Sequence, residues 1–266
     1  MKRSASERVI RYLWRQRRWL VLLAVSVAGM AAVSCSQLPG GDTASYPATP
    51  EYGVLATGAQ GGSFIDEFES AAGLRSRWQW LEEDPTSWSI QNSGLRSYLR
   101  LQVATQPKRN ILLTRKAIPD GRDFTIETMV VFRPTADFQG GGLLVYQDDN
   151  NCLTAIRAFC DLGGPICVGD GFYSDLVVGG VWESPNYATE IPAFSAAAPT
   201  AVAVWLRISR EGTIYNVYYS LNGLDWTLVG SHVANFRNVR VGLTAGNNQA
   251  GDPATTASFD YFSLMR

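Results

Sequence analysis

The sequence predicts an all-β fold, a two-sheet antiparallel sandwich of the jelly-roll type, over residues 63–266. Three observations support this prediction. Apolar and polar residues alternate with a period of two, turn signals separate the alternating runs, and no segment keeps a helical period over three turns. Many short strands joined by glycine-rich turns favour a sandwich over a layered α/β fold.

The alternation is clearest over 124–132 and in the C-terminal third of the chain. It places one set of side chains on each face of a half-buried strand. The C-terminal third predicts an antiparallel meander with strands at 202–209, 213–220, 226–230, 238–245 and 257–265. Asn222-Gly223 lies between the second and third strands and predicts a hairpin, because both residues of a tight turn must accept a positive φ angle.

The meander also carries a family resemblance. The runs Trp205–Thr213 and Tyr218–Trp226 together resemble the signature of a concanavalin A-like module, which occurs at the C-terminus of β-xylosidases and in stand-alone domains of uncharacterised function. Further segments agree in order and spacing: Trp78–Trp80 leading to Trp88–Ile90, Asn110–Leu113, Gly142–Asn150 and Phe259–Phe262.

The resemblance spans about residues 64–266. It implies a lectin-like jelly roll with a concave face, usually an accessory to carbohydrate-active enzymes. It does not imply a particular sugar, and the chain lacks the catalytic propeller of the β-xylosidases. Fold alone does not determine function.

Residues 1–34 have the features of a signal peptide. Seven basic residues and one acid precede an uncharged apolar run from Trp19 to Val33, and small residues lead to Cys35. This run is shorter than the roughly 20 residues of a membrane span. Ala32-Val33-Ser34-Cys35 resembles a lipobox, which implies cleavage before Cys35 and its diacylation. The alternative is an uncleaved N-terminal anchor, and both place the domain outside the cytoplasm of a bacterial-type cell.

Cys35 and residues 36–62, which are rich in Gly, Pro, Ser, Thr and Ala, predict a lipidated flexible tether that spans about 30 Å. Without residues 1–34 the chain keeps 16 of its 23 basic residues and 23 of its 24 acids, a net charge near −7. Nucleic acid is a poor partner for such a domain, because phosphate binding needs a clustered positive surface. This charge also gives no reason to lie on anionic lipid, so we expect one attachment point, the lipidated Cys35.

The sequence contains no recognisable catalytic motif. Its one histidine, His232, falls in a predicted loop, where a surface position is expected. Some sandwiches of this kind cleave β-glucans with Glu-x-Asp-x-x-Glu on one strand, but the nearest segment here, Glu82–Ser87, lacks the last carboxylate and contains a proline. We therefore predict a non-catalytic domain. A small glycoside hydrolase or lyase with paired cleft carboxylates remains the alternative.

Asp148, Asp149 and Asn150 form the most polar cluster. The simpler prediction is a hairpin tip between strands at 142–147 and 152–158. The functional prediction is a rim of hydrogen-bonding groups for sugar hydroxyls.

Asp66, Glu67 and Asp260 lie near the two ends of the domain sequence. The first and last strands of such sandwiches often lie side by side, so these acids could share a structural Ca²⁺ through oxygen ligands. The alternative is a set of solvated acids at a sheet edge.

Exposed aromatic side chains are the usual platform for sugar rings. Trp205 and Trp226 belong to the framework motif and are expected to pack structurally, as are the tryptophans of the first strands, Trp78, Trp80 and Trp88. Residues 159–199 are rich in Gly and Pro and predict long irregular loops, where specificity resides. The candidate platform is Trp182, Tyr187 and Tyr173, with Tyr146 nearby. The alternative is that these loop residues fold back as a minor core.

Three cysteines remain after Cys35: Cys152, Cys160 and Cys167. Cys160 and Cys167 bracket a six-residue loop and are the favoured disulfide pair, with Cys152–Cys160 as the rival pairing. A zinc site is not indicated, because the ligand spacing and a partner histidine are missing.

Together these features predict a membrane-tethered domain that binds a polysaccharide or oligosaccharide, or assists a neighbouring carbohydrate-active enzyme in doing so. It needs no cofactor beyond the structural calcium considered above. A protein-interaction domain is a further alternative.

Overall fold

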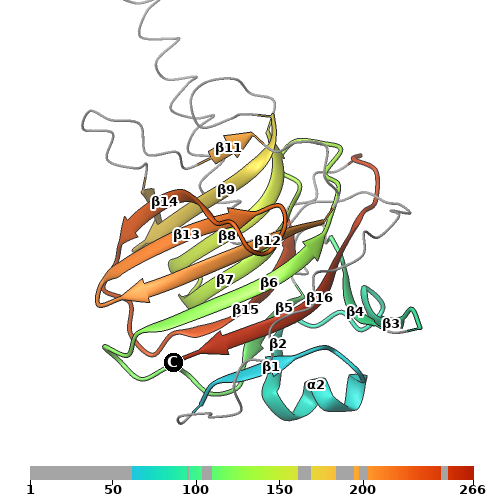
Figure 1. Cartoon of the computed structure of the whole chain (residues 1–266), viewed down its shortest axis with the longest axis horizontal. Coiled ribbons are helices and arrows are strands. Elements are labelled where there is room, and N and C mark those ends of the chain that lie inside the picture. Colours follow the sequence, from blue (N-terminus) through green and yellow to red (C-terminus); the bar gives the residue numbers. More distant parts are fainter. Residues whose placement is uncertain are drawn as a thin grey trace, which may run out of the picture.

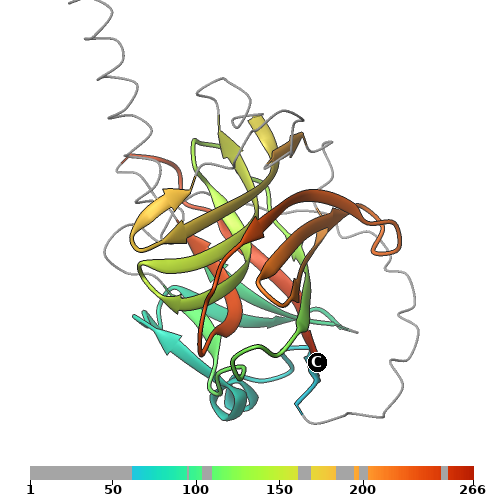
Figure 2. The same ribbon diagram turned by 90° about the vertical axis from the view of Figure 1, so that its left-hand side faces the viewer.

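The computed structural model describes residues 62–94, 96–103, 110–160, 169–183, 195–197, 203–246 and 251–266. In these residues two antiparallel sheets pack face to face, as Figures 1 and 2 show from two directions. A short helix, α2 (Ala71–Arg77), lies at one end of the sandwich. The predicted all-β sandwich is confirmed.

Sheet A combines strands from the N-terminal part of the domain with most of the C-terminal strands. Its spatial order is β14 (Thr227–Val233), β13 (Ile214–Ser220), β12 (Ala203–Glu211), β6 (Phe124–Val131), β16 (Thr256–Met265), β4 (Ser97–Gln102) and β3 (Trp88–Asn92), and β1 (Phe64–Asp66) also pairs with β16.

Sheet B packs on sheet A and is built mainly from the middle of the chain. Its spatial order is β10 (Val181–Glu183), β9 (Gly169–Val178), β8 (Asn151–Cys160), β7 (Gly140–Asp148), β15 (Arg240–Gly246), β5 (Ile111–Thr114) and β2 (Trp78–Leu81), and β11 (Ser195–Ala197) also pairs with β9.

The five predicted C-terminal strands are present within a few residues of their expected bounds. Only β12, β13 and β14 form a meander, however, because β15 lies in sheet B and β16 pairs with β6. The Asn222-Gly223 hairpin is confirmed, but its turn is not the expected two-residue type. β13 ends at Ser220 and β14 begins at Thr227, and of the two residues only Gly223 has a positive φ. The side chain of Asn222 instead accepts hydrogen bonds from the backbone N–H groups of Leu224 and Asp225, which shapes a longer loop.

Three strands, β9, β10 and β11, lie in the region that the sequence predicted to be irregular, and β9 is the longest of them. Residues 159–199 were expected to be irregular, yet 169–178 form a ten-residue strand paired with β8 over nine positions. Its alternation is genuine, with Phe172 and Leu176 in the core and Tyr173 and Val177 on the opposite face. The flanking glycines obscured a strand pattern that the sequence contains.

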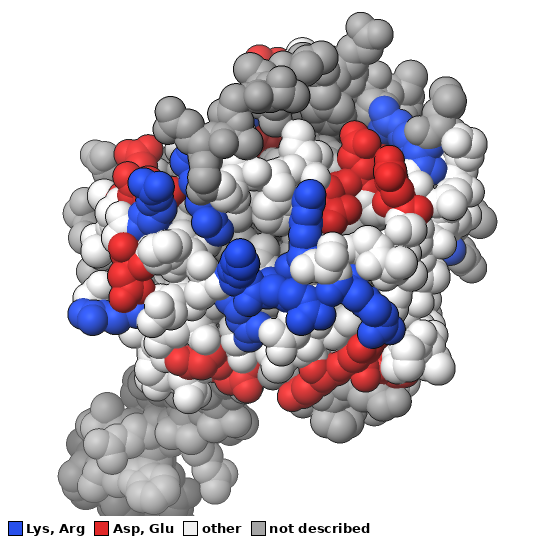
Figure 3. Space-filling view, turned by 90° about the horizontal axis from the view of Figure 1, so that it is seen from below, with Lys and Arg blue, Asp and Glu red and all other residues white. Residues whose placement is uncertain are grey.

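α2 is held at the end where β1 and the C-terminus lie (Figure 1), an end seen face-on in Figure 3. Its N-cap is Ser70, whose Oγ accepts a hydrogen bond from the Gly73 N–H at 3.1 Å. Such a cap satisfies one of the free donors of the first turn. No helix in the described residues has the length and hydrophobicity needed to cross a membrane.

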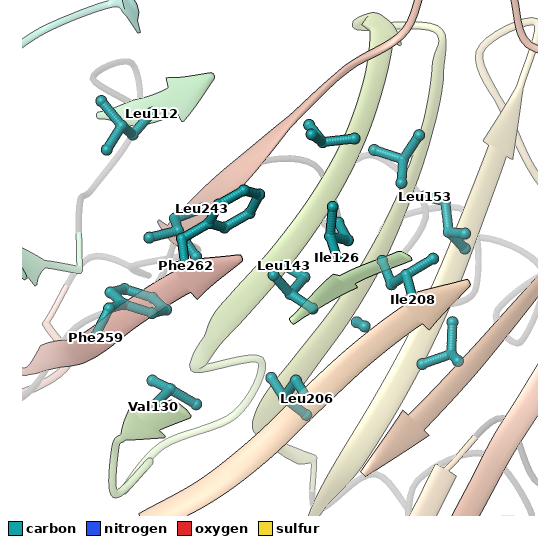
Figure 4. Packing of buried hydrophobic residues seen from close by; sticks show 14 of the residues in the cluster. Leu112, Ile126, Val130, Leu143, Leu153, Leu206, Ile208, Leu243, Phe259 and Phe262 are labelled. Atoms are coloured by element: carbon teal, nitrogen blue, oxygen red, sulfur yellow. The ribbon is translucent and has the colours of Figure 1, made fainter. Parts of the chain in front are cut away.

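The core lies between the two sheets, where Leu143 of β7, Ile126 of β6 and Leu206 of β12 point toward one another (Figure 4). All residues of this large cluster fall between Phe68 and Leu264. The first and last strands also pair with each other, at Phe64↔Leu264 and Asp66↔Phe262. We therefore expect residues 62–266 to fold without the preceding segment, and the predicted proximity of the terminal strands is confirmed.

The framework tryptophans pack as predicted. Trp78 is buried with its ring edge-on to Phe262 at 4.9 Å between centroids. Trp80 and Trp88 stack at 4.9 Å and join the edge strand of sheet B to that of sheet A. On the other side of sheet A, Trp205 is buried and Trp226 lies 3.6 Å beneath the Arg207 guanidinium.

Candidate functional site

The candidate site lies on the outer face of sheet B, the face turned away from sheet A. Along β8 and β9 the side chains alternate between the core and this face. Leu153, Ala155, Phe172 and Leu176 enter the core. The alternate residues point to the outer face. On β8 these are Cys152, Thr154 and Ile156, and on β9 they are Tyr173, Asp175 and Val177.

Trp182, the first predicted platform residue, is brought to this face by β10. It is opposite Val177 in the register of β9 and β10, and its side chain is half-buried. Its indole Nε1–H donates a hydrogen bond to Oδ1 of Asp175 at 3.2 Å. The ring is therefore fixed over the outer face by a bond to the sheet itself.

Asp175 was not predicted, although its position on β9 makes it central to this face. Burial raises the pKa of its carboxyl, and the hydrogen bond from Trp182 lowers it in part. Thr154 lies directly opposite Asp175 on β8, and its Oγ1 is buried with no hydrogen-bond partner. An aromatic ring, a carboxylate acceptor and an unsatisfied hydroxyl thus gather at one corner of the sheet.

Tyr173 shares this outer face but is only 9% exposed. Its ring packs with Ile156, Ala158 and Cys160 in a small apolar cluster, and its hydroxyl donates to the carbonyl oxygen of Gly169 at 2.5 Å. This arrangement matches the alternative in which the tyrosine belongs to a minor core.

Tyr146 and the acidic cluster lie at the β7–β8 hairpin, as the simpler prediction stated. The Tyr146 hydroxyl donates to Oδ1 of Asp149 at 2.9 Å. Oδ1 of Asp148 accepts from the Asn150 N–H at 2.9 Å and from the Asn151 side chain at 2.8 Å. Desolvation alone would raise the pKa of Asp148, but these hydrogen bonds and one from Gln147 lower it. The polar groups of the tip are largely engaged with one another.

Two predicted site residues, Tyr187 and Cys167, lie outside the described residues, as does the predicted lipidation site Cys35. The platform role of Tyr187 and the Cys160–Cys167 disulfide therefore stay predictions. The rival Cys152–Cys160 pairing is wrong. Both cysteines lie on β8, eight residues and hence roughly 26 Å apart, whereas bridged Cα atoms lie within about 7 Å.

The acids considered for calcium have other partners. Asp66 accepts hydrogen bonds from the Trp78 indole at 2.8 Å and from the Phe68 N–H at 2.9 Å. Asp260 forms a 2.9 Å ion pair with Arg96, and burial and the nearby Glu67 raise its pKa while Arg96 lowers it. No group of three or more potential ligands gathers among the described residues. The arrangement does not support the predicted shared calcium site.

Asp66 instead fastens the first strand to Trp78. We expect Asp66→Ala to lower the free energy of unfolding by about 1–2 kcal/mol, because the buried indole N–H loses its acceptor. The control Glu67→Ala removes an exposed carboxylate and should change it by less than about 0.5 kcal/mol. Urea denaturation with and without EDTA measures both. If both variants lost the same free energy of unfolding, and EDTA lowered that of the wild type by the same amount, the result would instead support a shared calcium ion.

His232 is not in a surface loop, which corrects the sequence prediction. It lies on β14, is 5% exposed, and its Nε2 is 2.6 Å from Oγ of Ser174 on β9. Burial lowers its pKa to about 4. The pair joins the edge of sheet A to sheet B inside the sandwich.

The segment Glu82–Ser87 forms the turn between β2 and β3. Asp84 accepts hydrogen bonds from Thr86 and Ser87, and Glu83 accepts one from the Trp88 indole at 3.2 Å. These acids shape the turn and do not line a strand of the outer face.

The comparisons with known proteins agree with this architecture. The family model described as the β-xylosidase C-terminal concanavalin A-like domain matches residues 65–265. No curated protein matches the chain. Among solved structures, the GH43 BlXynB protein from Bacillus licheniformis has a TM-score of 0.61 at 21% identity, over 76% of this chain and 39% of that protein.

Two other structures extend the comparison. The xylan β-1,4-xylosidase from Bacillus halodurans C-125 has a TM-score of 0.60 at 18% identity, over 86% of this chain and 41% of the enzyme. Lectin I-B4 from Griffonia simplicifolia, in its metal-free form, has a TM-score of 0.50 at 12% identity, over 77% of this chain and 98% of the lectin. The chain spans about two fifths of the length of the two bacterial proteins, and these identities indicate a shared fold.

Proposed function

Because the chain belongs to the family of β-xylosidase C-terminal concanavalin A-like domains, we propose that it is a membrane-tethered, extracytoplasmic module that binds glycan. The binding face is the outer face of sheet B, and the module itself is non-catalytic. It assists a neighbouring carbohydrate-active enzyme.

The pair of Trp182 and Asp175 is the observation that carries this proposal. An indole ring presents a flat apolar surface with a polar edge, which suits the C–H face of a sugar ring. Its N–H is already bound to Asp175, so the ring needs little ordering when ligand arrives. The free lone pairs of the carboxylate can then accept hydrogen bonds from sugar hydroxyls, and charge-assisted bonds of this kind are the stronger ones.

The spacing of carboxylates favours binding over hydrolysis. Glycosidases place two carboxyl groups about 5–9.5 Å apart. Asp175 of β9 lies opposite Thr154 of β8 in the strand register. Asp148 of β7 lies opposite Asn151, which is also on β8. Two strand spacings and three residues of offset separate their Cα atoms by roughly 14 Å. Among the described strand residues, these acids do not make a catalytic pair.

The N-terminal sequence supports the cellular setting. The signal-peptide features, the lipobox resemblance at Cys35 and the tether over 36–62 favour an exported lipoprotein. A Cys160–Cys167 disulfide would suit the oxidising compartment that such export implies.

Affinity electrophoresis of residues 62–266 tests the glycan proposal, with gels that contain xylan, mixed-linkage β-glucan, mannan or pectin. We expect retardation by one polymer. Trp182→Ala should weaken binding at least about tenfold, because the stacking surface is lost. Asp175→Asn keeps the shape of the side chain and should weaken binding less.

Trp226→Ala is the matched control, because it removes another half-buried tryptophan from the outer face of sheet A. It should leave retardation unchanged once a thermal melt confirms folding. Unchanged mobility of the wild type in all gels would sink the glycan proposal. Release of reducing ends, abolished by a single carboxylate substitution, would favour the hydrolase alternative.

A further inference from the structure

The end of the sandwich that carries α2 and the C-terminus has an uneven charge distribution. A band of Lys and Arg crosses this end, and acidic side chains lie on either side of the band (Figure 3). Six exposed cations belong to segments that meet here: Arg75 and Arg77 of α2, Arg115, Lys116 and Arg122 between β5 and β6, and Arg237 between β14 and β15.

Backbone contacts hold these segments together. The Arg115 N–H donates to the carbonyl oxygen of Arg77 at 2.8 Å, and its guanidinium Nε donates to that of Arg75 at 2.9 Å. The β5–β6 segment also reaches the loop of Arg237, where the Ile118 N–H donates to the carbonyl oxygen of Val239 at 2.7 Å. The cations are thus gathered by the fold and kept in place despite their mutual repulsion.

Nearby acids are partly engaged in shaping the loops. Asp120 accepts a hydrogen bond from the Asn238 N–H at 2.6 Å, and Asp123 accepts one from the Gly212 N–H at 2.7 Å. Arg75 lies 3.9 Å from a carboxylate oxygen of Glu83, with its own side chain 67% exposed. Such an exposed contact neutralises little of the charge.

The chain enters the folded domain at this same end. The backbone N–H of Arg266 donates to Oγ of Ser63 at 3.0 Å. A Cβ on Gly62 would lie 2.6 Å from the Arg266 guanidinium. Burial and the charge of Arg122 lower the pKa of Arg266, which places Arg122 beside the entry point. Gly62, the first described residue, therefore lies at the basic end of the domain.

We propose that this basic end docks on the anionic phospholipid surface of the membrane toward which the tether leads. A cluster of four to eight Lys or Arg residues close to a membrane is the size that recognises anionic lipid. A tether that spans about 30 Å lets the domain reach the bilayer or leave it. A diacylated Cys35 would already anchor the chain, so the basic end would add an electrostatic contact of the folded domain with the lipid surface.

The lipidated Cys35 would hold the domain near a membrane, but the proposed contact with anionic lipid is made by the folded domain itself. It can therefore be measured on residues 62–266, in which the apolar N-terminal run cannot contribute. This contact also does not use the outer face of sheet B, so Trp182→Ala should bind vesicles like the wild type.

Co-sedimentation with vesicles tests the proposal. Residues 62–266 should bind phosphatidylcholine vesicles that contain about one quarter phosphatidylglycerol, and should not bind pure phosphatidylcholine. Binding should weaken steeply between 50 and 300 mM NaCl, on the order of tenfold or more, because exposed charges are screened. Lys116→Glu should weaken it on the order of tenfold.

Arg133→Glu is the matched control, since it makes the same charge change beyond the far end of β6, on an exposed residue. It should leave vesicle binding within about twofold of the wild type. Three results would overturn the proposal: no binding to anionic vesicles, equal losses in the two variants, or binding that ignores salt. Binding to polygalacturonate in the absence of vesicle binding would also overturn it, in favour of an anionic glycan.

Discussion

Gly242→Ala is expected to lower the free energy of unfolding by roughly 3–5 kcal/mol. A Cβ at this position would lie 1.8 Å from the carbonyl oxygen of Leu112 and 2.9 Å from its carbonyl carbon. These are backbone atoms of the neighbouring strand β5, so no rotation of a side chain can relieve the overlap. β5 itself would have to move away from β15.

Moving β5 lowers stability strongly, because few residue pairs join it to β15 and a small displacement breaks them all. In the described residues it pairs with β15 at two positions, Gly242↔Leu113 and Leu243↔Leu112. β2 in turn joins sheet B through β5. Displacing β5 therefore takes Trp78 and Leu112 out of the core together. This cost is larger than that of a single overpacked side chain.

Urea denaturation followed by tryptophan fluorescence measures this effect. The matched control is Gly73→Ala in α2, where the nearest atom to a Cβ is Oγ of Ser70 at 3.3 Å. Alanine is favoured over glycine within a helix by roughly 0.5–1 kcal/mol, so this variant should be unchanged or slightly more stable. A wild-type denaturation curve for Gly242→Ala would contradict the close approach of β5 and β15.

The sequence was sufficient to predict most of the sandwich. Period-two alternation identified β6 and the C-terminal strands. In β6 the two faces enter different apolar clusters, with Ile126 and Val130 in the main core and Met129 and Val131 on the outer face of sheet A. The same alternation is present in β9, but it is difficult to recognise because glycines interrupt the run Gly169–Val178. The loop at Asn222 also differs, because the amide side chain can satisfy backbone donors and so support a longer turn.

The candidate site was predicted less completely, for a physical reason. Sequence periodicity gives the face of a strand but not the partner across it. Trp182 could be singled out as an aromatic residue in a glycine-rich region, whereas Asp175 becomes significant only when β10 folds back beside β9. Net charge has the same limit, because a value near −7 does not show that Arg75, Arg115 and Lys116 gather at one end of the domain.

The stability of the domain is expected to fall by about 3 kcal/mol as the pH decreases from 6.5 to 4, through His232 alone. Burial lowers the pKa of His232 to about 4 in the folded protein, whereas an unfolded histidine titrates near pH 6.5. Between these values the unfolded chain binds a proton that the folded chain does not. Lower pH therefore favours unfolding throughout this window, and the loss is complete near pH 4.

The effect can be assigned to one residue because the sequence contains a single histidine. His232→Gln keeps a polar group opposite Ser174 but does not titrate. Asp175 and Asp260 have raised pKa values, so they act in the opposite direction, but equally in both proteins. The wild-type free energy of unfolding minus that of the variant should therefore fall between pH 6.5 and 4 and stay level above pH 7. Parallel curves across this range would show that His232 is not buried as a neutral side chain.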